Sequence, residues 1–195
     1  MALVFHSGFE SGNGAEWATF NGSVAASTTF KKTGAYSIRC NPTGGVGRAE
    51  VSVAKTRLSF YIYIATLPSS DDTITTGASN GTNYAVLQLT TTGEIDLYYG
   101  AVRRKDGTTS LSTGIWYRIS LSCSSNTIRY FINGAQEATD YTTGDTLAAE
   151  NINRLGFTAT TADAYFDDYV ADNTLSTTDL GDIRCAAVAL PNAEG

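Results

Sequence analysis

A period-two alternation of apolar and polar residues along most of the chain constrains its fold more than any other sequence feature. In "GIWYRISLSC", residues 114–123, Ile115, Tyr117, Ile119, Leu121 and Cys123 occupy every second position. Arginine and serine stand among the residues between them. Successive side chains of a β-strand point to opposite faces of a sheet, so this spacing predicts a strand with one face in a core.

Turn signals divide the alternating segments into hairpins. "NTIRYFINGAQ", residues 126–136, follows the first strand after a short turn at 124–126. It contains Asn133-Gly134, a pair that favours a two-residue hairpin because both positions tolerate positive φ. The segment therefore predicts three consecutive antiparallel strands with short connections.

The same pattern continues on both sides of these hairpins. "RLSFYIYIA" at 57–65 alternates, and "YAVLQLTTTGEIDLYYG" at 84–100 predicts a hairpin that turns around residues 91–93. We interpret "TLAAENINRLG" at 146–156, the segment nearest to a helical pattern, as a loop with one turn. "NRLGFTA" at 153–159 and "AYFDDYVAD" at 164–172 are interpreted as the strands that close the main body. Roughly a dozen short strands predict an all-β fold, a two-sheet antiparallel β-sandwich of the jelly-roll type.

Size, charge and cysteine content narrow the class of protein. The 195 residues suit one domain, and a formal net charge of -6 disfavours nucleic acid and anionic membrane as partners. No segment reaches the ~20 apolar residues of a membrane span, and the N-terminus lacks the pattern of a signal peptide. The three cysteines lack metal-ligand spacing, and we expect Cys123 to be buried, while one disulfide stays open.

The C-terminal 21 residues differ from the hairpin series. A connector rich in serine and threonine, residues 173–179, precedes a β-like segment from Ile183 to Leu190. The chain thus divides into a jelly roll at 1–174 and a connector with a short C-terminal β arm at 175–195. The arm either returns to the sandwich as an edge strand or pairs with a neighbouring subunit, since an unpaired strand is a template for another chain.

Several motifs resemble a known family. "GFESGNGAEW", "KTGAYSIRC", "GIWYRISLSCSSNTIRYFINGAQ" and "AYFDDYVADN" together resemble the concanavalin-A-like or laminin-G-like jelly roll over about residues 1–174. The ending "LGDIRCAAVALPNAEG" resembles the segment that follows such jelly rolls in bacteriophage structural proteins, with Cys185 where valine is usual.

The resemblance implies a non-enzymatic virion structural protein of a bacteriophage. Such a capsid decoration, tail or fibre module is assembled in the host cytoplasm, forms a homo-oligomer, contacts other virion subunits and can bind host surface glycans. Two alternatives stay open: a carbohydrate-binding module, and a glycan hydrolase or lyase.

The acidic pair Glu94 and Asp96 disfavours the hydrolase. "GEIDLYYG" resembles the E-I-D-x-x-E signature of the laminarinase family, but its third acidic place falls on Tyr98 or Tyr99. Glycosidic cleavage ordinarily needs two carboxyl groups on opposite sides of the scissile bond. Two residues apart on one strand, the pair stands side by side at about 7 Å. We therefore predict no catalytic residue and expect a solvated strand face.

Aromatic residues opposite the apolar faces are the candidates for ligand binding. Tyr61, Tyr63, Tyr98, Trp116 and Arg118 could stack on sugar rings and bond their hydroxyls. The alternative is that loops bury both faces of the sandwich.

No cofactor is required by any motif, although the family resemblance implies a structural calcium ion between the first and last strands. Glu10 and Asp168 match the carboxylates used there. Asp167 is expected on the opposite strand face from Asp168, and only one of the two is expected to reach the ion. The basic cluster "RRKDG", residues 103–107, is interpreted as a solvated hairpin tip.

Overall fold

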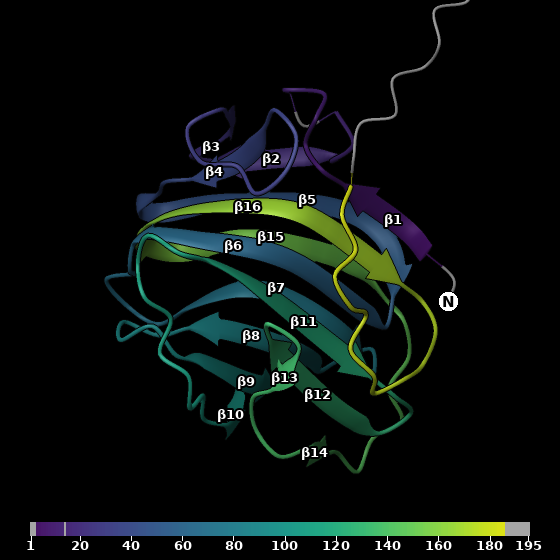
Figure 1. Ribbon diagram of the computed structural model, residues 1–195. Helices are drawn as coiled ribbons and strands as arrows, with labels where there is room; N and C mark the ends of the chain where they lie inside the picture. Colours follow the sequence, from purple (N-terminus) through teal and green to yellow (C-terminus); the bar gives the residue numbers. More distant parts are fainter. Residues whose placement is uncertain (1–2, 14, 186–195) are drawn as a thin grey trace, which may run out of the picture.

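The computed structural model describes residues 3–13 and 15–185, and within these ranges the chain forms two antiparallel β-sheets and no helix. Figure 1 shows the sheets stacked in two layers with short connections at their ends. The predicted all-β sandwich is confirmed. The described residues accordingly contain no helix that could cross a membrane.

Sixteen strands make up the two sheets over the described part of the chain. Sheet A has the order β13 (Ala135–Gln136), β12 (Thr127–Ile132), β11 (Trp116–Cys123), β6 (Arg57–Thr66), β16 (Asp163–Asp172), β4 (Ser37–Cys40), β3 (Val24–Ser27), with β1 (Leu3–Ser7) beside β16 and β14 (Tyr141–Thr142) beside β12. Sheet B has the order β10 (Val102–Lys105), β9 (Ile95–Tyr99), β8 (Tyr84–Leu89), β7 (Asp72–Ser79), β15 (Glu150–Thr161), β5 (Thr43–Lys55), β2 (Thr19–Gly22).

The predicted hairpins are present. β11 pairs with β12 and β12 with β13, and Asn133 and Gly134 connect the last two with φ angles of 51° and 88°. Positive φ at both positions gives a turn whose twist matches that of the flanking strands. β8 and β9 form the second predicted hairpin.

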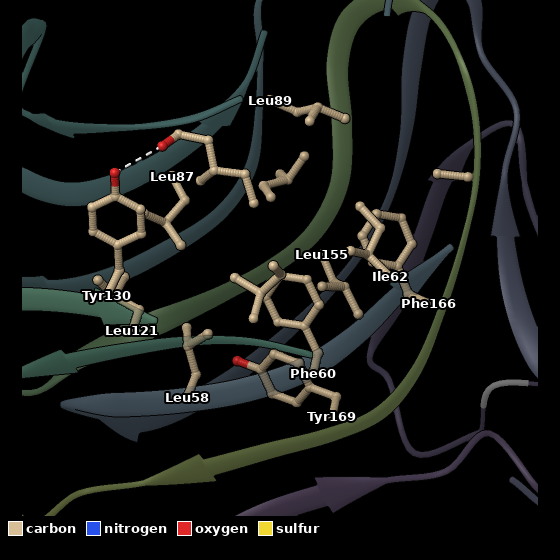
Figure 2. Close-up of a cluster of buried hydrophobic side chains, with 14 of the residues drawn as sticks. Leu58, Phe60, Ile62, Leu87, Leu89, Leu121, Tyr130, Leu155, Phe166 and Tyr169 are labelled. Atoms are coloured by element: carbon tan, nitrogen blue, oxygen red, sulfur yellow. Dashed lines mark hydrogen bonds between the residues drawn. The ribbon is translucent and has the colours of Figure 1, made fainter. Parts of the chain in front are cut away.

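The inner faces of the two sheets form one apolar core (Figure 2). Leu58, Phe60 and Ile62 of β6 are fully buried, and Leu87 and Leu89 of β8 face them from sheet B. Each such side chain contributes about 1.5–3 kcal/mol of hydrophobic free energy. The alternation seen in the sequence is therefore the alternation between this core and the outer faces.

One segment was interpreted wrongly. Residues 146–156 do not form a loop with a turn throughout, because β15 begins at Glu150 and lies inside sheet B between β7 and β5. Asn153 breaks the apolar pattern there, since it points into the core and donates to the carbonyls of Val51 and Val53. A buried polar side chain at an inward position interrupts the alternation of apolar and polar residues by which a strand is recognised.

The segment after β16 crosses the outer face of sheet A. We call residues 173–185 the strap; Figure 1 shows it in yellow, running back over the sheet that contains β6 and β11. Its backbone is bonded to β11 where Ser176 donates to the carbonyl of Cys123. Up to Cys185 the C-terminal segment is thus neither an edge strand nor an arm, and it is docked on its own chain. The rest of the predicted β arm, residues 186–190, lies outside the described residues.

The cysteines are buried and free. Cys40, Cys123 and Cys185 form no disulfide, and the predicted burial of Cys123 is confirmed.

Candidate functional site

Glu94 lies at the end of the 90–93 turn rather than opposite a proton donor. Its carboxylate accepts hydrogen bonds from the hydroxyls of Thr92 and Thr90. These bonds stabilise the charged form and lower the pKa of Glu94. The acid of a glycosidase has a raised pKa instead, so Glu94 is poorly suited to give up a proton to a leaving group.

Asp96 is buried, which corrects the expectation of a solvated strand face. It is 3% exposed, and its two oxygens accept from Arg103 Nη1 at 3.1 Å and from the Gly107 N–H at 2.8 Å. Arg103 belongs to β10, an edge strand of sheet B. The predicted solvated tip at 103–107 is therefore an exposed edge strand that neutralises Asp96.

Two further carboxylates lie beside Glu94 and Asp96. Glu94 and Asp96 line a polar pocket of about 320 Å³ together with Asp71 and Asp106. Asp71 accepts from the Thr91 N–H at 3.0 Å, and Asp106 accepts from Arg103 Nε at the same distance. Each of the four carboxylates thus accepts a hydrogen bond or forms an ion pair. The pocket they line is polar rather than the apolar surroundings typical of a catalytic acid.

Four of the five predicted ligand residues do come together, on the outer face of sheet A. Trp116 stands opposite Tyr63 and Arg118 opposite Tyr61 across β11 and β6. Tyr98 does not join them, because β9 belongs to sheet B.

The strap covers the Tyr61–Arg118 half of this set. Arg118 donates to both oxygens of Asp179 at 2.8 and 2.6 Å, and the hydroxyl of Tyr61 donates to Asp182 at 2.5 Å. Tyr61 is 6% and Arg118 8% exposed. Burial and the bond to Asp182 raise the pKa of Tyr61 to about 12. Neither side chain is open to a ligand while the strap is docked.

The other half is partly covered by an aromatic neighbour. Phe30 stacks on Tyr63 at 4.3 Å between ring centroids, and Tyr63 contacts Trp116 at 5.6 Å. Tyr63 and Trp116 are half-buried. Rings that pack on one another offer edges rather than a free stacking surface.

Sheet B carries a row of outward side chains across all of its strands. Arg103 stands opposite Tyr98, Tyr98 opposite Val86, and Val86 opposite Thr76. The neighbouring pair Thr75 and Leu155 brings Thr76 beside Arg154. The complete row is Arg103, Tyr98, Val86, Thr76, Arg154, Glu50 and Thr19.

Two hollows lie along this row, one on each side of β15. The first, about 240 Å³, is lined by Thr73, Thr76, Tyr84, Val86, Ile152, Arg154 and Thr158. The second, about 260 Å³, is lined by Ala18, Thr19, Glu50, Val51, Ser52, Ile152 and Arg154. Ile152 and Arg154 separate them, and Ile152 is 38% exposed. The two hollows share Ile152 and Arg154 in their linings, and we call them together the groove.

The polar contacts of this groove stay within sheet B. Glu50 accepts from Arg154 Nε at 2.9 Å and from Asn21 Nδ2 at 3.0 Å. Thr76 donates to the carbonyl of Ile152 at 3.0 Å. Apolar side chains beside a few fixed polar groups are the usual composition of a small-molecule site.

The predicted calcium ligands hold a loop. Glu10 accepts from the Ala35 N–H at 2.8 Å, and Asp168 accepts from the Thr33 hydroxyl and the Cys185 N–H at 2.9 and 2.8 Å. Ca²⁺ requires six to eight oxygen ligands, whereas the groups that face these carboxylates are donors. No cluster of three acidic, histidine or cysteine side chains suitable for a metal occurs among the described residues. The hydrogen-bond donors that face Glu10 and Asp168 do not suit a calcium ion. The structure does not test calcium binding itself, so the ion stays a prediction.

Asp167 and Asp168 do not alternate as expected. Asp168 has a φ of 48° and the register shifts between Asp167 and Val170, so both carboxylates are buried against the same loop. Asp167 accepts from the N–H groups of Lys32 and Thr33. Burial raises the pKa of Asp167 to about 7.

Sequence reasoning missed Arg154, Glu50, Tyr84 and Ile152. "NYAVLQL" does carry a signal, because Tyr84 and Val86 alternate with buried Ala85 and Leu87. Ile152 falls in the segment that was interpreted as a loop, and Arg154 falls where that loop overlaps the predicted strand at 153–159. Their outward direction follows only once β15 is recognised as a strand.

The protein is thus a β-sandwich whose C-terminal strap crosses the outer face of sheet A and whose outer face of sheet B carries the groove. Solved structures with this fold include binding domains. The chain matches the binding domain of Paraclostridial Mosquitocidal Protein 1 with a TM-score of 0.64 and 14% identity, over 90% of this chain and 50% of that one. It thus spans half the length of that structure.

Two further solved structures match nearly over their whole length. One is the carbohydrate-binding module CBM66 from Bacillus subtilis, with a TM-score of 0.57, 10% identity and coverage of 80% of this chain and 95% of that one. The other is domain 4 of AbnA, a GH43 extracellular arabinanase from Geobacillus stearothermophilus, in complex with arabinotriose. Its TM-score is 0.55 at 17% identity, with 88% and 95% coverage. At sequence identities this low, the structural similarity shows a shared fold and nothing about function.

No family model and no curated protein matches the sequence.

Proposed function

We propose that this chain is a non-catalytic glycan-binding module that holds its ligand in the groove across the outer face of sheet B. The observation that carries the proposal is the contrast between the two outer faces. The strap and the Phe30 ring cover much of the predicted platform on sheet A. Sheet B has two hollows beside the exposed Ile152 and the half-buried Tyr84 and Arg154.

The groove has the chemistry that sugar binding uses. Tyr84, Val86 and Ile152 give apolar surface for the C–H face of a pyranose ring. Thr73 and Ser52 bring hydroxyls, and the charged pair at Glu50 fixes orientation. Two adjoining hollows suit a ligand of at least two sugar units laid across the strands.

The comparisons support the binding class. One structural neighbour is a carbohydrate-binding module, and another was solved with arabinotriose. Those ligands belong to the neighbours, and the glycan of this chain is named below only by its chemistry.

A bacteriophage particle is the setting that the motif resemblance implies, and we retain it as a proposal that rests on that resemblance alone. Many copies on a capsid or tail would multiply weak glycan contacts into useful avidity. Mass spectrometry of purified virions tests it: peptides of this chain should be present in stoichiometric amounts, and their absence would remove the proposal.

A glycan array with two matched variants tests the binding face. Binding should fall with Tyr84→Ala and persist with Trp116→Ala, because the two aromatic residues lie on opposite sheets. Both variants keep the core intact, since each replaces an outward, half-buried ring. Loss of binding with Trp116→Ala alone would move the site to sheet A. An array without any signal from the wild-type chain would contradict glycan binding itself.

A further inference from the structure

We propose that the glycan held in this groove is acidic and that Arg154 binds its carboxylate. The inference rests on the proposed function and adds the chemical class of the ligand. It is argued from three observations: two arginines share the Glu50 carboxylate, the Nη1 and Nη2 groups of Arg154 have no acceptor among the described residues, and an acidic pocket lies near β9.

Glu50 is shared by two guanidinium groups. Its Oε1 accepts from Arg48 Nε at 2.7 Å and from Arg154 Nε at 2.9 Å, and its Oε2 accepts from Asn21. Within this cluster one carboxylate faces two guanidinium groups, an excess of one positive charge in a chain whose formal net charge is -6.

Arg154 has donors to spare. Only its Nε donates within the described residues, while Nη1 and Nη2 have no acceptor there. Its side chain is 35% exposed, and it lines both hollows. A guanidinium with two free parallel N–H groups matches the two oxygens of a carboxylate.

The first hollow is where the carboxylate belongs. Arg154 is the only charged residue that lines it among the described residues, whereas Glu50 faces the second hollow. Tyr84 and Val86 lie beside Arg154 as apolar surface for the ring that carries the acid. A carboxylate in the second hollow would meet Glu50 instead.

The acidic pocket limits how the ligand runs. Glu94, Asp96, Asp71 and Asp106 gather near β9, and Arg103 is the only positive side chain among the described residues that line that pocket. Like charges repel an acidic chain from this edge. We infer that an acidic oligosaccharide extends from the first hollow over β15 toward β5 and β2, away from β9 and β10.

The experiment compares acids with their esters. Oligogalacturonate, oligoglucuronate and sialyl-oligosaccharides are printed on one array, each beside its carboxyl-methyl ester and beside neutral oligosaccharides including arabinotriose. The acids should bind at least about tenfold more tightly than their esters, because the ester cannot accept a charge-assisted pair of hydrogen bonds. The preference should weaken with salt.

Variants assign the preference to a residue. Arg154→Gln should remove the tenfold preference for the acid, and Arg154→Lys should restore part of it. Arg39→Gln is the matched control, since Arg39 is a half-exposed arginine paired with Asp163 on sheet A. Thermal melts should show that all three variants are folded.

The outcomes separate the inference from the proposed function. Equal binding of acid and ester, or binding of neutral glycans only, would overturn the acidic ligand while leaving glycan binding in place. A preference for the acid that survives Arg154→Gln would overturn the role of Arg154. Silence of the whole array would overturn both.

Discussion

Removal of Asp179 should weaken the docking of the strap on sheet A at a measurable cost in stability. The Arg118 side chain is 9% exposed and donates to both oxygens of Asp179, whose side chain is 18% exposed. With Asp179→Ala the guanidinium keeps the Ser120 hydroxyl and the Gly181 carbonyl but loses its counter-charge. Breaking a fully buried pair costs about 3–5 kcal/mol, and the partial exposure of Asp179 reduces the expected loss to about 2–3 kcal/mol.

Arg184→Ala is the matched control on the same segment. Arg184 pairs with Asp182 at 3.2 Å, and their side chains are 54% and 49% exposed. Exposed pairs contribute little to stability, so this substitution should leave the free energy of unfolding nearly unchanged.

Urea unfolding at pH 7, followed by tryptophan fluorescence and by circular dichroism, measures both values. Coincidence of the two probes shows that a single free energy of unfolding applies. The double variant Arg118→Met with Asp179→Leu should recover most of the loss, because it removes the buried charge as well as its partner. If Asp179→Ala costs no more than Arg184→Ala, the strap does not depend on this ion pair and the covered state of sheet A has been explained wrongly.

Three further predictions concern other groups. Burial lowers the pKa of Lys55 to about 7, so this lysine binds more protons in the unfolded chain above that pH, and its own contribution to stability should rise by about 1–2 kcal/mol from pH 7 to 8.5 under reducing conditions. Lys55→Met should flatten this rise, and an unchanged slope would contradict its cause. Chelation by EDTA should leave Tm unchanged because protein donors already occupy the Glu10 and Asp168 carboxylates, whereas a drop that Ca²⁺ restores would establish the calcium ion. Glu94→Gln should leave glycan binding intact, and a release of reducing ends that this substitution abolishes would make the chain a hydrolase.

Much of the fold could be predicted because its signals are local. In β6 the apolar Leu58, Phe60, Ile62 and Ile64 occupy every second position, and Asn133-Gly134 determines its own turn. The strand β15 was recognised only in part because Asn153 occupies an inward position. Its amide is satisfied by the backbone of β5, about a hundred residues earlier, and no local pattern announces such a partner.

The sequence predicted which types of residue could bind a ligand but not which of them lie together. Outward aromatic residues have the same spacing on either sheet, so the sequence could not place Tyr98 on sheet B and Trp116 on sheet A. The cover over Arg118 comes from Asp179, 61 residues away, in a segment without alternation. The burial of Asp96 likewise depends on Arg103 after the next turn, and a pair of acids on a strand looks solvated until that strand is paired.

The groove on sheet B is tested most directly by a crystal structure of the chain with the tightest ligand from the array. The sugar should lie over Tyr84 and Val86, with a carboxylate on Nη1 and Nη2 of Arg154 and the chain extending toward Thr19. A sugar bound instead at Tyr63 and Trp116, or between Glu94 and Asp106, would contradict the account.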